Sequence, residues 1–408
     1  MKDIKQAKFD FPLFTHEKDL VYLDSAATAL KPQIVIDAER EYLERYSANI
    51  ARGLYPLAEK ATEKFEAVRG KIASFIGAAS SQEIIFTAGA TGALNLVAEL
   101  LADRLQPGDN VATTEMEHHS NFLPWKELAK RRSLDFRVLP ITPEGLLDIA
   151  VLKNFIDEHT QVVAFSAVSN VLGTINPVQE ITALIKSIHP HIIVVVDAAQ
   201  AVSHLPLAVS EWGADFVAFS AHKMFGPTGV GVLYGKQSLL ETLHPIHFGG
   251  GMVLDACAKE TLYKDSPYRF EAGTPNIGGV IALGAAIEYV ESIGTNNIRA
   301  HEMALTAYAL KRLKETFGET IRIVGPLDPA KRGGIIAFSF ENIHPHDIAH
   351  LLGEQNICVR AGEHCATPLH RSLHLHATTR ISFSLYNNEN NIKRLIVVLK
   401  EIQTLFSK

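Results

Sequence analysis

Over the first part of the chain, short runs of consecutive apolar residues alternate with longer stretches in which apolar residues recur every three or four positions. The short runs, rich in valine and isoleucine, predict strands, and the periodic stretches predict helices with one apolar face. The expected strands are 81–87, 109–116, 136–140, 162–168, 191–199, 216–219 and 230–234. Because these runs lack polar alternation, we expect an α/β fold in which a mostly parallel sheet has helices on both faces.

A different pattern begins near residue 278. Helices are expected over 278–294, 298–317, 346–355 and 388–406, and strands over 321–325 and 333–340. A long helical stretch with few intervening strands differs from the preceding alternation, so we place a domain boundary near residue 290. The predicted organisation is an N-terminal arm (1–21), a large domain (22–290) and a smaller C-terminal α/β domain (291–408).

Composition narrows the classes of partner. The chain is 47% hydrophobic and 21% charged, as expected of an ordinary globular protein. Its formal net charge of -6 gives no reason to expect nucleic acid or an anionic membrane as partner. The N-terminus lacks the apolar core of a signal peptide, and three cysteines are too few for a disulfide framework. We therefore expect a cytoplasmic protein in which an important cysteine is reactive.

Polar residues follow the expected strands at the edge where open α/β sheets bind ligands. Gly89, Thr91 and Gly92 begin a helix, where free N–H groups and the helix dipole favour a phosphate, although Thr91 could also serve as a simple helix cap. His118 and His119 are adjacent, but no further metal ligands with suitable spacing lie nearby. The other residues of this kind are Ser169, Asn170, Asp197, Gln200, Ser220, His222 and Lys223.

Lys223 lies in a polar turn between two apolar strands, where a lysine usually points toward water. The other strand-end residues favour a different explanation. Together they offer a phosphate site, an imidazole, an amide, a carboxylate for a pyridinium nitrogen and an amine for a Schiff base. These are the groups that pyridoxal 5′-phosphate requires, so the sequence predicts that Lys223 binds this cofactor covalently.

Several motifs carry a resemblance to a known family. They are YLDSAATALKP (22–32), MEHHSNFLPW (116–125), SNVLGTINP (169–177), VDAAQA (196–201), SAHKMFGPTGVGVLY (220–234), FEAGTPN (270–276) and RAGEHCATP (360–368). In this order they resemble the fold-type I pyridoxal-phosphate enzymes of the class V aminotransferase group. Within that group the chain is most similar to cysteine desulfurases of the SufS/CsdA type, because the segment around Cys365 distinguishes desulfurases from relatives with other reactions.

The resemblance implies a role for each matching residue. Lys223 is the Schiff-base lysine, Asp197 pairs with the pyridine nitrogen, and His118 stacks on the ring. Gln200 and Asn170 face the phenolate oxygen. The phosphate is held by Thr91, Ser220 and His222, and by Gly273 and Thr274 from the other subunit of a homodimer. Arg380, with Arg360 nearby, binds the substrate carboxylate.

The implied reaction converts L-cysteine to L-alanine while Cys365 takes the sulfur as a persulfide. A sulfur-acceptor protein of the SufE/CsdE type then receives it for iron–sulfur cluster or thio-cofactor assembly. Cys365 follows Gly362 on an expected flexible loop, so we expect an exposed, movable thiol. Cys358, in an apolar strand, is expected to be inert, and Cys257 has no assigned role.

Three positions depart from the usual family pattern: Ala51, Gly92 and Glu363. None of these departures removes a core catalytic group. They bear on the details of the substrate pocket, the active-site loop and the sulfur acceptor that fits. A selenocysteine lyase has nearly the same residues and stays an alternative. Kynureninase-like or epimerase-like chemistry does not need Cys365, and a non-enzymatic sulfur carrier or metal scaffold leaves Lys223 and Asp197 unexplained.

Overall fold

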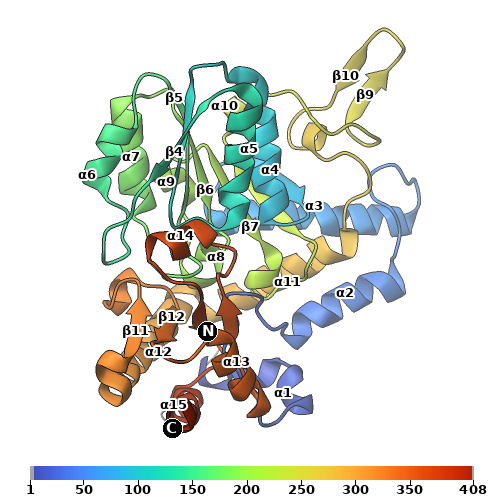
Figure 1. The fold of residues 1–408 in the computed structure, drawn as a ribbon. Helices are drawn as coiled ribbons and strands as arrows, with labels where there is room; N and C mark the ends of the chain where they lie inside the picture. Colours follow the sequence, from blue (N-terminus) through green and yellow to red (C-terminus); the bar gives the residue numbers. More distant parts are fainter. Residues whose placement is uncertain (1–3, 407–408) are drawn as a thin grey trace.

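The computed structural model describes residues 4–406, and its largest element is a seven-stranded sheet (Figure 1). The strands are β2 (Ile84–Thr87), β3 (Asn110–Thr114), β4 (Asp135–Leu139), β5 (Thr160–Ser166), β6 (Ile193–Asp197), β7 (Phe216–Ser220) and β8 (Gly231–Gly235). They follow the order β2-β8-β7-β6-β5-β3-β4, and only β8 runs antiparallel to its neighbours. The mostly parallel sheet predicted from the apolar runs is confirmed.

Both faces of this sheet are buried. In β6, Val195 packs in the core beneath one set of helices, while Val194 and Val196 pack in the core on the opposite face. Side chains of a strand alternate between faces, so a strand buried on both sides needs apolar residues at every position. The larger helices around the sheet are α3 (Pro56–Ile76), α4 (Ala90–Leu101), α5 (Leu123–Arg132), α6 (Ile149–Phe155), α7 (Val178–Ile188) and α11 (Ile277–Ile293).

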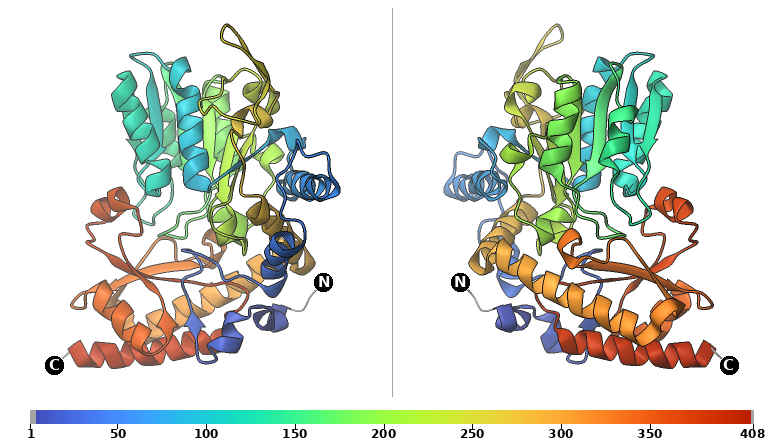
Figure 2. Two further views of the ribbon diagram at one scale, coloured as in Figure 1. Left: turned by 90° about the vertical axis from the view of Figure 1, so that its right-hand side faces the viewer. Right: turned by 90° about the vertical axis from the view of Figure 1, so that its left-hand side faces the viewer.

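The C-terminal part forms a second, smaller sheet. Its antiparallel strands lie in the order β11 (Ile321–Val324), β12 (Ile335–Phe340), β15 (Thr378–Ser382) and β14 (Arg360–Gly362). Its helices are α12 (Thr295–Phe317), α13 (Pro345–Glu354) and α15 (Glu389–Phe406). Figure 2 shows the red helix α15 along the side of this domain that faces away from the large sheet, while the orange helix α12 runs toward that side from the large domain. The smaller C-terminal domain is therefore present, although its predicted limits stay a prediction.

The N-terminal segment joins the small domain. Strand β1 (Val21–Tyr22) pairs in parallel with β13 (Ile357–Cys358), and Asp24 forms a β-bridge with Ser382. Val21 and Leu23 lie in the small domain's core. The first residues of the family-like segment thus pack beside the C-terminal strands, because β13 offers them an open hydrogen-bonding edge.

A two-stranded hairpin projects from the large domain at the upper right of Figure 1. Its strands are β9 (Val253–Ala256) and β10 (Thr261–Tyr263), and Cys257 is exposed at the turn between them. The remaining helices are α1 (Leu13–His16), α2 (Gln33–Arg45), α8 (Ala201–His204), α9 (Val209–Trp212), α10 (Gln237–Leu240) and α14 (Thr367–Ser372). The 3-10 helices are η1 (Ile4–Asp10), η2 (Ser81–Glu83), η3 (Ala102–Arg104), η4 (His119–Asn121), η5 (Ala221–Lys223), η6 (Tyr268–Phe270), η7 (Gly318–Thr320) and η8 (Pro329–Lys331).

Within residues 4–406, no single helix is long and apolar enough to cross a membrane. Helices α11 and α12 reach that length and mean hydropathy only when taken together, across a bend of 73°.

Candidate active site

One cavity of about 260 Å³ brings together almost every residue that the sequence singled out. Asp197 ends β6 and Ser220 ends β7, so the cavity lies at the carboxyl edge of the large sheet. Its lining includes Ala26, Thr91, His118, Ser120, Asn170, Asp197, Gln200, Ser220, His222, Lys223, Arg360, His364, Cys365 and Arg380. Among the residues to which the family resemblance gave a role, Gly273 and Thr274 are the two that do not line it.

Lys223 ends the short helix η5, which connects β7 to β8. Its side chain is half-buried, and among residues 4–406 its amine has no hydrogen bond or ion pair. The pKa of this amine is lowered to about 8, mainly by burial and also by Arg380, while Asp197 and Cys365 oppose the change. A lysine of this kind is largely charged at neutral pH but readily supplies the neutral, nucleophilic amine.

Asp197 and Gln200 lie on the turn that follows β6. Asp197 is 6% exposed, and its Oδ1 accepts a hydrogen bond from the backbone N of Ala199 at 2.8 Å. Burial raises the pKa of the Asp197 carboxyl, while the nearby Lys223 lowers it. Gln200 donates from Nε2 to the carbonyl oxygen of Ala26 at 2.8 Å, but its buried Oε1 has no partner in the described chain. An unpaired buried acceptor that lines a cavity is suited to a ligand.

The start of α4 provides an anion site. Its N-cap residue, Gly89, supplies no side-chain cap, and the backbone N of Ala90 donates to Ser220 Oγ at 2.7 Å. Thr91 lies inside the first turn and its Oγ1 is 2.7 Å from Ser120 Oγ, so the alternative that Thr91 caps the helix is wrong. Gly231 passes directly beneath: a Cβ there would lie 2.3 Å from Gly89 Cα. The glycines thus allow β8 to support the helix start at close range.

Two imidazoles of the cavity are held neutral. His118 Nδ1 lies 3.1 Å from the backbone N of Ser120, and burial lowers the pKa of His118 to about 3, with Lys223 as a second cause. Burial likewise lowers the pKa of His222 to about 4. Within residues 4–406, neither the adjacent histidines nor other His, Cys, Asp or Glu side chains form a group of three or more that could hold a metal ion.

Beneath His118 lies Glu117, which the sequence analysis did not single out. Its carboxylate is fully buried and accepts hydrogen bonds from Thr114 Oγ1 at 2.5 Å, Asn121 Nδ2 at 2.7 Å and the backbone N of Ser166 at 3.1 Å, as well as from Ser166 Oγ. Burial raises the pKa of Glu117 to about 7, although these hydrogen bonds lower it. The network joins β3, η4 and β5 and so fixes the backbone that carries His118.

Two arginines share a carboxylate from the N-terminal segment. Arg360 donates from Nη2 to Asp24 Oδ2 at 2.9 Å, and Arg380 lies 3.4 Å from Asp24 Oδ1. Arg380 also donates from Nη1 to the carbonyl oxygen of Asn170 at 2.9 Å, while its buried Nε has no partner in the described residues. Burial lowers the pKa of Arg380 to about 10, and Asp24 opposes this change. Asp24 was missed, although an acidic residue directly after an apolar strand was a usable signal.

Cys365 is exposed on a short turn between β14 and α14, as expected of a reactive thiol. His364 and Cys365 both have positive φ angles (51° and 56°), which is uncommon for residues other than glycine. The turn is also tied down: the backbone N of His119 donates to the carbonyl oxygen of Cys365 at 2.7 Å, and Asn170 Nδ2 donates to that of His364 at 2.8 Å. Movement of the thiol on a flexible loop therefore stays a prediction. Cys358 is partly buried, and burial raises the pKa of its thiol.

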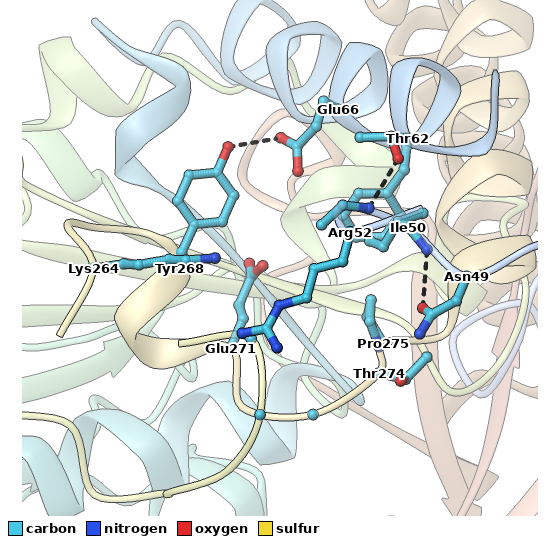
Figure 3. Close-up of a pocket in the computed structure, with 15 residues that line it drawn as sticks. Asn49, Ile50, Arg52, Thr62, Glu66, Lys264, Tyr268, Glu271, Thr274 and Pro275 are labelled. Carbon is cyan, nitrogen blue, oxygen red and sulfur yellow. Dashed lines mark hydrogen bonds between the residues drawn. The ribbon is translucent and has the colours of Figure 1, made fainter. Parts of the chain in front are cut away.

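Gly273 and Thr274 line a separate cavity of about 510 Å³ (Figure 3). Arg52 and Lys264 also line it, and Tyr268 Oη donates to Glu66 Oε2 at 3.3 Å beside them. Exposed apolar side chains lie nearby in the sequence, and these are Leu54, Tyr55, Leu57, Phe248, Leu254 and Leu262. The departures Ala51 and Gly92 line this cavity and a neighbouring one of about 490 Å³, respectively.

Residues 21–395 match the aminotransferase class V family, and the chain belongs to that family. Within it, the chain groups with the cysteine desulfurases. It is 46% identical to a probable cysteine desulfurase of Streptomyces coelicolor over 99% of this chain and 98% of the relative. It is 44% identical to a cysteine desulfurase of Serratia proteamaculans over 98% of both chains.

Solved structures agree with this grouping. The fold matches an apo cysteine desulfurase from Thermococcus onnurineus with a TM-score of 0.94 and 38% identity, covering 98% of both chains. It also matches the Escherichia coli cysteine desulfurase CsdA with a TM-score of 0.92 and 34% identity, covering 100% of both. The expected fold-type I architecture is confirmed, and pyridoxal 5′-phosphate is the cofactor of the family.

The cavity fits that cofactor on its own evidence. It contains an amine without a partner at Lys223, an orphaned amide oxygen at Gln200 and a buried carboxylate at Asp197. A helix start without a side-chain cap completes it. The amine suits an aldehyde, the carboxylate a protonated ring nitrogen and the helix start a phosphate, while the unpaired amide oxygen of Gln200 can accept a hydrogen bond from a donor on the ligand.

Proposed function

We propose that this protein converts L-cysteine to L-alanine with pyridoxal 5′-phosphate and receives the released sulfur on Cys365 as a persulfide. The observation that supports this most directly is the composition of the 260 Å³ cavity. It places a partnerless amine, a buried carboxylate and an exposed thiol around one space, and Cys365 raises the pKa of Lys223 by its charge. A desulfurase needs all three groups, whereas kynureninase-like or epimerase-like chemistry does not need the thiol.

The cofactor, when bound, supplies an electron sink that makes the substrate's Cα proton acidic and its sulfur easier to remove. The protein's residues divide the remaining tasks. Thr91, Ser220 and His222 hold the phosphate together with the free N–H groups of α4. Asp197 would keep a proton on the pyridine nitrogen, and His118, being neutral, would contact the ring without adding a second positive charge.

Lys223 would hold the cofactor and would move a proton to and from the substrate carbon with Nζ. Its lowered pKa suits this task, because both protonation states are populated near neutral pH. Arg380 is positioned to bind the substrate carboxylate with its free Nε, with Arg360 on the outer side. Cys365 attacks as the thiolate: an Sγ–S bond forms, the substrate's C–S bond breaks, and the carbon product leaves as alanine after protonation.

We further propose a homodimer in which Gly273 and Thr274 approach the phosphate site of the second subunit. The two residues lie outside the cavity of their own chain, near a hairpin that projects from the fold and beside exposed apolar side chains. A sulfur-acceptor protein of the SufE/CsdE type is the expected recipient of the persulfide. Selenocysteine lyase activity stays the second candidate, since the same groups can act on selenium.

Peptide mapping tests the proposal. Wild-type protein treated with L-cysteine in the absence of reductant should carry an added sulfur on Cys365. The Cys365→Ala variant should retain the cofactor but lose sulfur transfer, whereas the Cys358→Ala and Cys257→Ala controls should keep it. An added sulfur on Cys358 or Cys257, or full cysteine desulfuration by Cys365→Ala, contradicts the assignment. Alanine release from cysteine and selenocysteine, measured side by side, distinguishes the two candidate substrates.

A further inference from the structure

A buried histidine–carboxylate pair, His204 and Glu302, lies outside the residues that line the 260 Å³ cavity. His204 Nδ1 is 2.6 Å from Glu302 Oε2, and the two side chains are 3% and 1% exposed. His204 ends the single-turn helix α8 of the large domain. Glu302 belongs to α12, whose later residues Leu305, Ala309 and Leu313 lie in the core of the small domain. The pair therefore connects the two domains through one hydrogen bond.

The side chains around Glu302 provide few other hydrogen-bond donors for its carboxylate. Arg299, one turn earlier on α12, is bound to the carbonyl oxygens of Arg332, Pro329 and Ala330. Among residues 4–406, His204 is the one side chain that forms a hydrogen bond or ion pair with the Glu302 carboxylate. A buried carboxylate without a donor is costly, so this hydrogen bond is needed for the packing to persist.

Two consecutive glycines pack directly against the pair. A Cβ at Gly333 would lie 3.5 Å from His204 Cδ2, and one at Gly334 would lie 3.4 Å from Glu302 Oε2. These glycines precede β12, which pairs with β15, the strand of Arg380. The backbone of the small domain thus encloses the His204–Glu302 pair, and the link has little room to shift.

On its other side, His204 is coupled to Gln200 by one continuous turn. The carbonyl oxygen of Gln200 accepts from the backbone N of Ser203 at 3.1 Å and from Ser203 Oγ at 2.9 Å. Val202 N donates to the carbonyl oxygen of Ala198 at 3.0 Å, so the turn begins directly after Asp197. Helix α8 has only one turn, and Gln200 directly precedes it. A displacement of His204 is therefore transmitted to Gln200.

We propose that His204 and Glu302 are positioning residues that fix Gln200 relative to the small domain. The proposal rests on the proposed function for the role of Gln200 as a cofactor contact. Through this hydrogen bond, the turn that carries Asp197 and Gln200 keeps its place against the domain that carries Arg380 and Cys365. The pair touches neither substrate nor cofactor and acts through Gln200.

Two isosteric variants separate the hydrogen bond from simple packing. The amide nitrogen of asparagine occupies the place of His204 Nδ1, so His204→Asn keeps a donor for Glu302. The amide of glutamine extends to the place of Nε2, so His204→Gln leaves Glu302 without one. Holoenzyme of each variant is scanned for the pH midpoint of the cofactor's visible absorbance and for the rate of cofactor loss on dilution.

We expect His204→Gln to move the absorbance midpoint in the same direction as Gln200→Ala and to speed cofactor loss about tenfold, the scale of one lost buried hydrogen bond. His204→Asn should stay within about twofold of the wild type, which is a conservative rescue. The double variant His204→Gln/Gln200→Ala should lose cofactor no faster than Gln200→Ala, because coupled residues are not additive. The exposed Glu315→Gln, a change farther along α12, is a control that should resemble the wild type.

Unchanged absorbance and cofactor release in His204→Gln overturn the proposal, as does equal behaviour of the Asn and Gln variants. Additive losses in the double variant show that His204 does not act through Gln200, which also overturns it. If His204→Gln does not fold, Glu302→Asp, which withdraws the carboxylate by one methylene, replaces it with the same expected direction. The absorbance and cofactor-release measurements need no substrate. An absence of cysteine turnover would therefore contradict the proposed function but would not change the outcome of this test.

Discussion

The lowered pKa of Lys223 leads to a quantitative prediction for the cofactor-free protein. An ordinary lysine has a pKa near 10.5, so at pH 8 roughly 0.3% of its amine is neutral. With a pKa of about 8, half of the Lys223 amine is neutral at that pH, which is an excess of roughly 150-fold. We therefore expect Lys223 to react with an electrophile faster than an ordinary lysine does, with a half-maximal rate near pH 8.

Two substitutions test the causes of this shift in opposite directions. Asp197 stabilises the charged amine, so Asp197→Asn should lower the pH of half-maximal reaction. Arg380 destabilises it, so Arg380→Gln should raise that pH. If the two charges act specifically, the pH of half-maximal reaction shifts in opposite directions in the two variants. If the substitutions only loosen the site, that pH rises in both variants toward the value for an ordinary lysine.

Competitive labelling with acetic anhydride between pH 6 and 10, followed by peptide mass spectrometry, measures these rates. The cofactor-free protein is used, and exposed Lys126 in the same digest serves as the reference for reagent reactivity. A half-maximal rate for Lys223 above pH 9.5 refutes the claim that burial controls this amine. A rise in that pH in Asp197→Asn refutes the assignment of Asp197 as the group that stabilises its charge.

Other predictions follow from the same geometry. Asp197→Asn should keep the cofactor and the fold but slow alanine release by roughly 10²- to 10⁴-fold, the effect of losing a buried charge partner; near-normal turnover argues against its role. Arg380→Lys should raise the KM for cysteine about tenfold or more, because lysine lacks the free Nε, while the exposed Arg360→Lys should have a smaller effect. Burial raises the folded-state pKa of Glu117 to about 7, so this group takes up a proton on folding between roughly pH 4.5 and 7. The free energy of unfolding from urea titrations should therefore fall with rising pH in that window, by up to about 1.4 kcal/mol per pH unit, relative to Glu117→Gln.

Much of the fold follows from local sequence patterns. The expected strand over 191–199 contains β6, and the expected helix over 298–317 lies within α12. Such elements could be predicted because a strand buried on both faces requires an unbroken apolar run, as the alternate burial of Val194 and Val195 shows. Residues at the ends of these strands could then be grouped, since parallel strands present their carboxyl ends at one edge.

Contacts between distant segments could not be predicted in this way. The Asp24 carboxylate meets Arg360 and Arg380 only because β1 pairs with β13, and no local periodicity specifies that pairing. The hydrogen bonds that tie down the Cys365 turn come from His119 and Asn170, on two different strand ends of the other domain. A loop with glycine beside it looks mobile in the sequence, and its restraint is visible only in three dimensions.

The Asp24 contacts also set an order of events during synthesis. Asp24 is separated by 336 residues from Arg360 and by 356 from Arg380. At ribosomal rates of roughly 5–20 residues per second, Asp24 waits on the order of 20–70 s before its partners are made. All seven strands of the large sheet lie within residues 84–235, so they have been synthesised before Arg360 and Arg380 are made. A nascent chain therefore contains Lys223 and Asp197 well before it contains Arg360, Cys365 and Arg380, so the two sides of the 260 Å³ cavity come from parts of the chain that are made at different times.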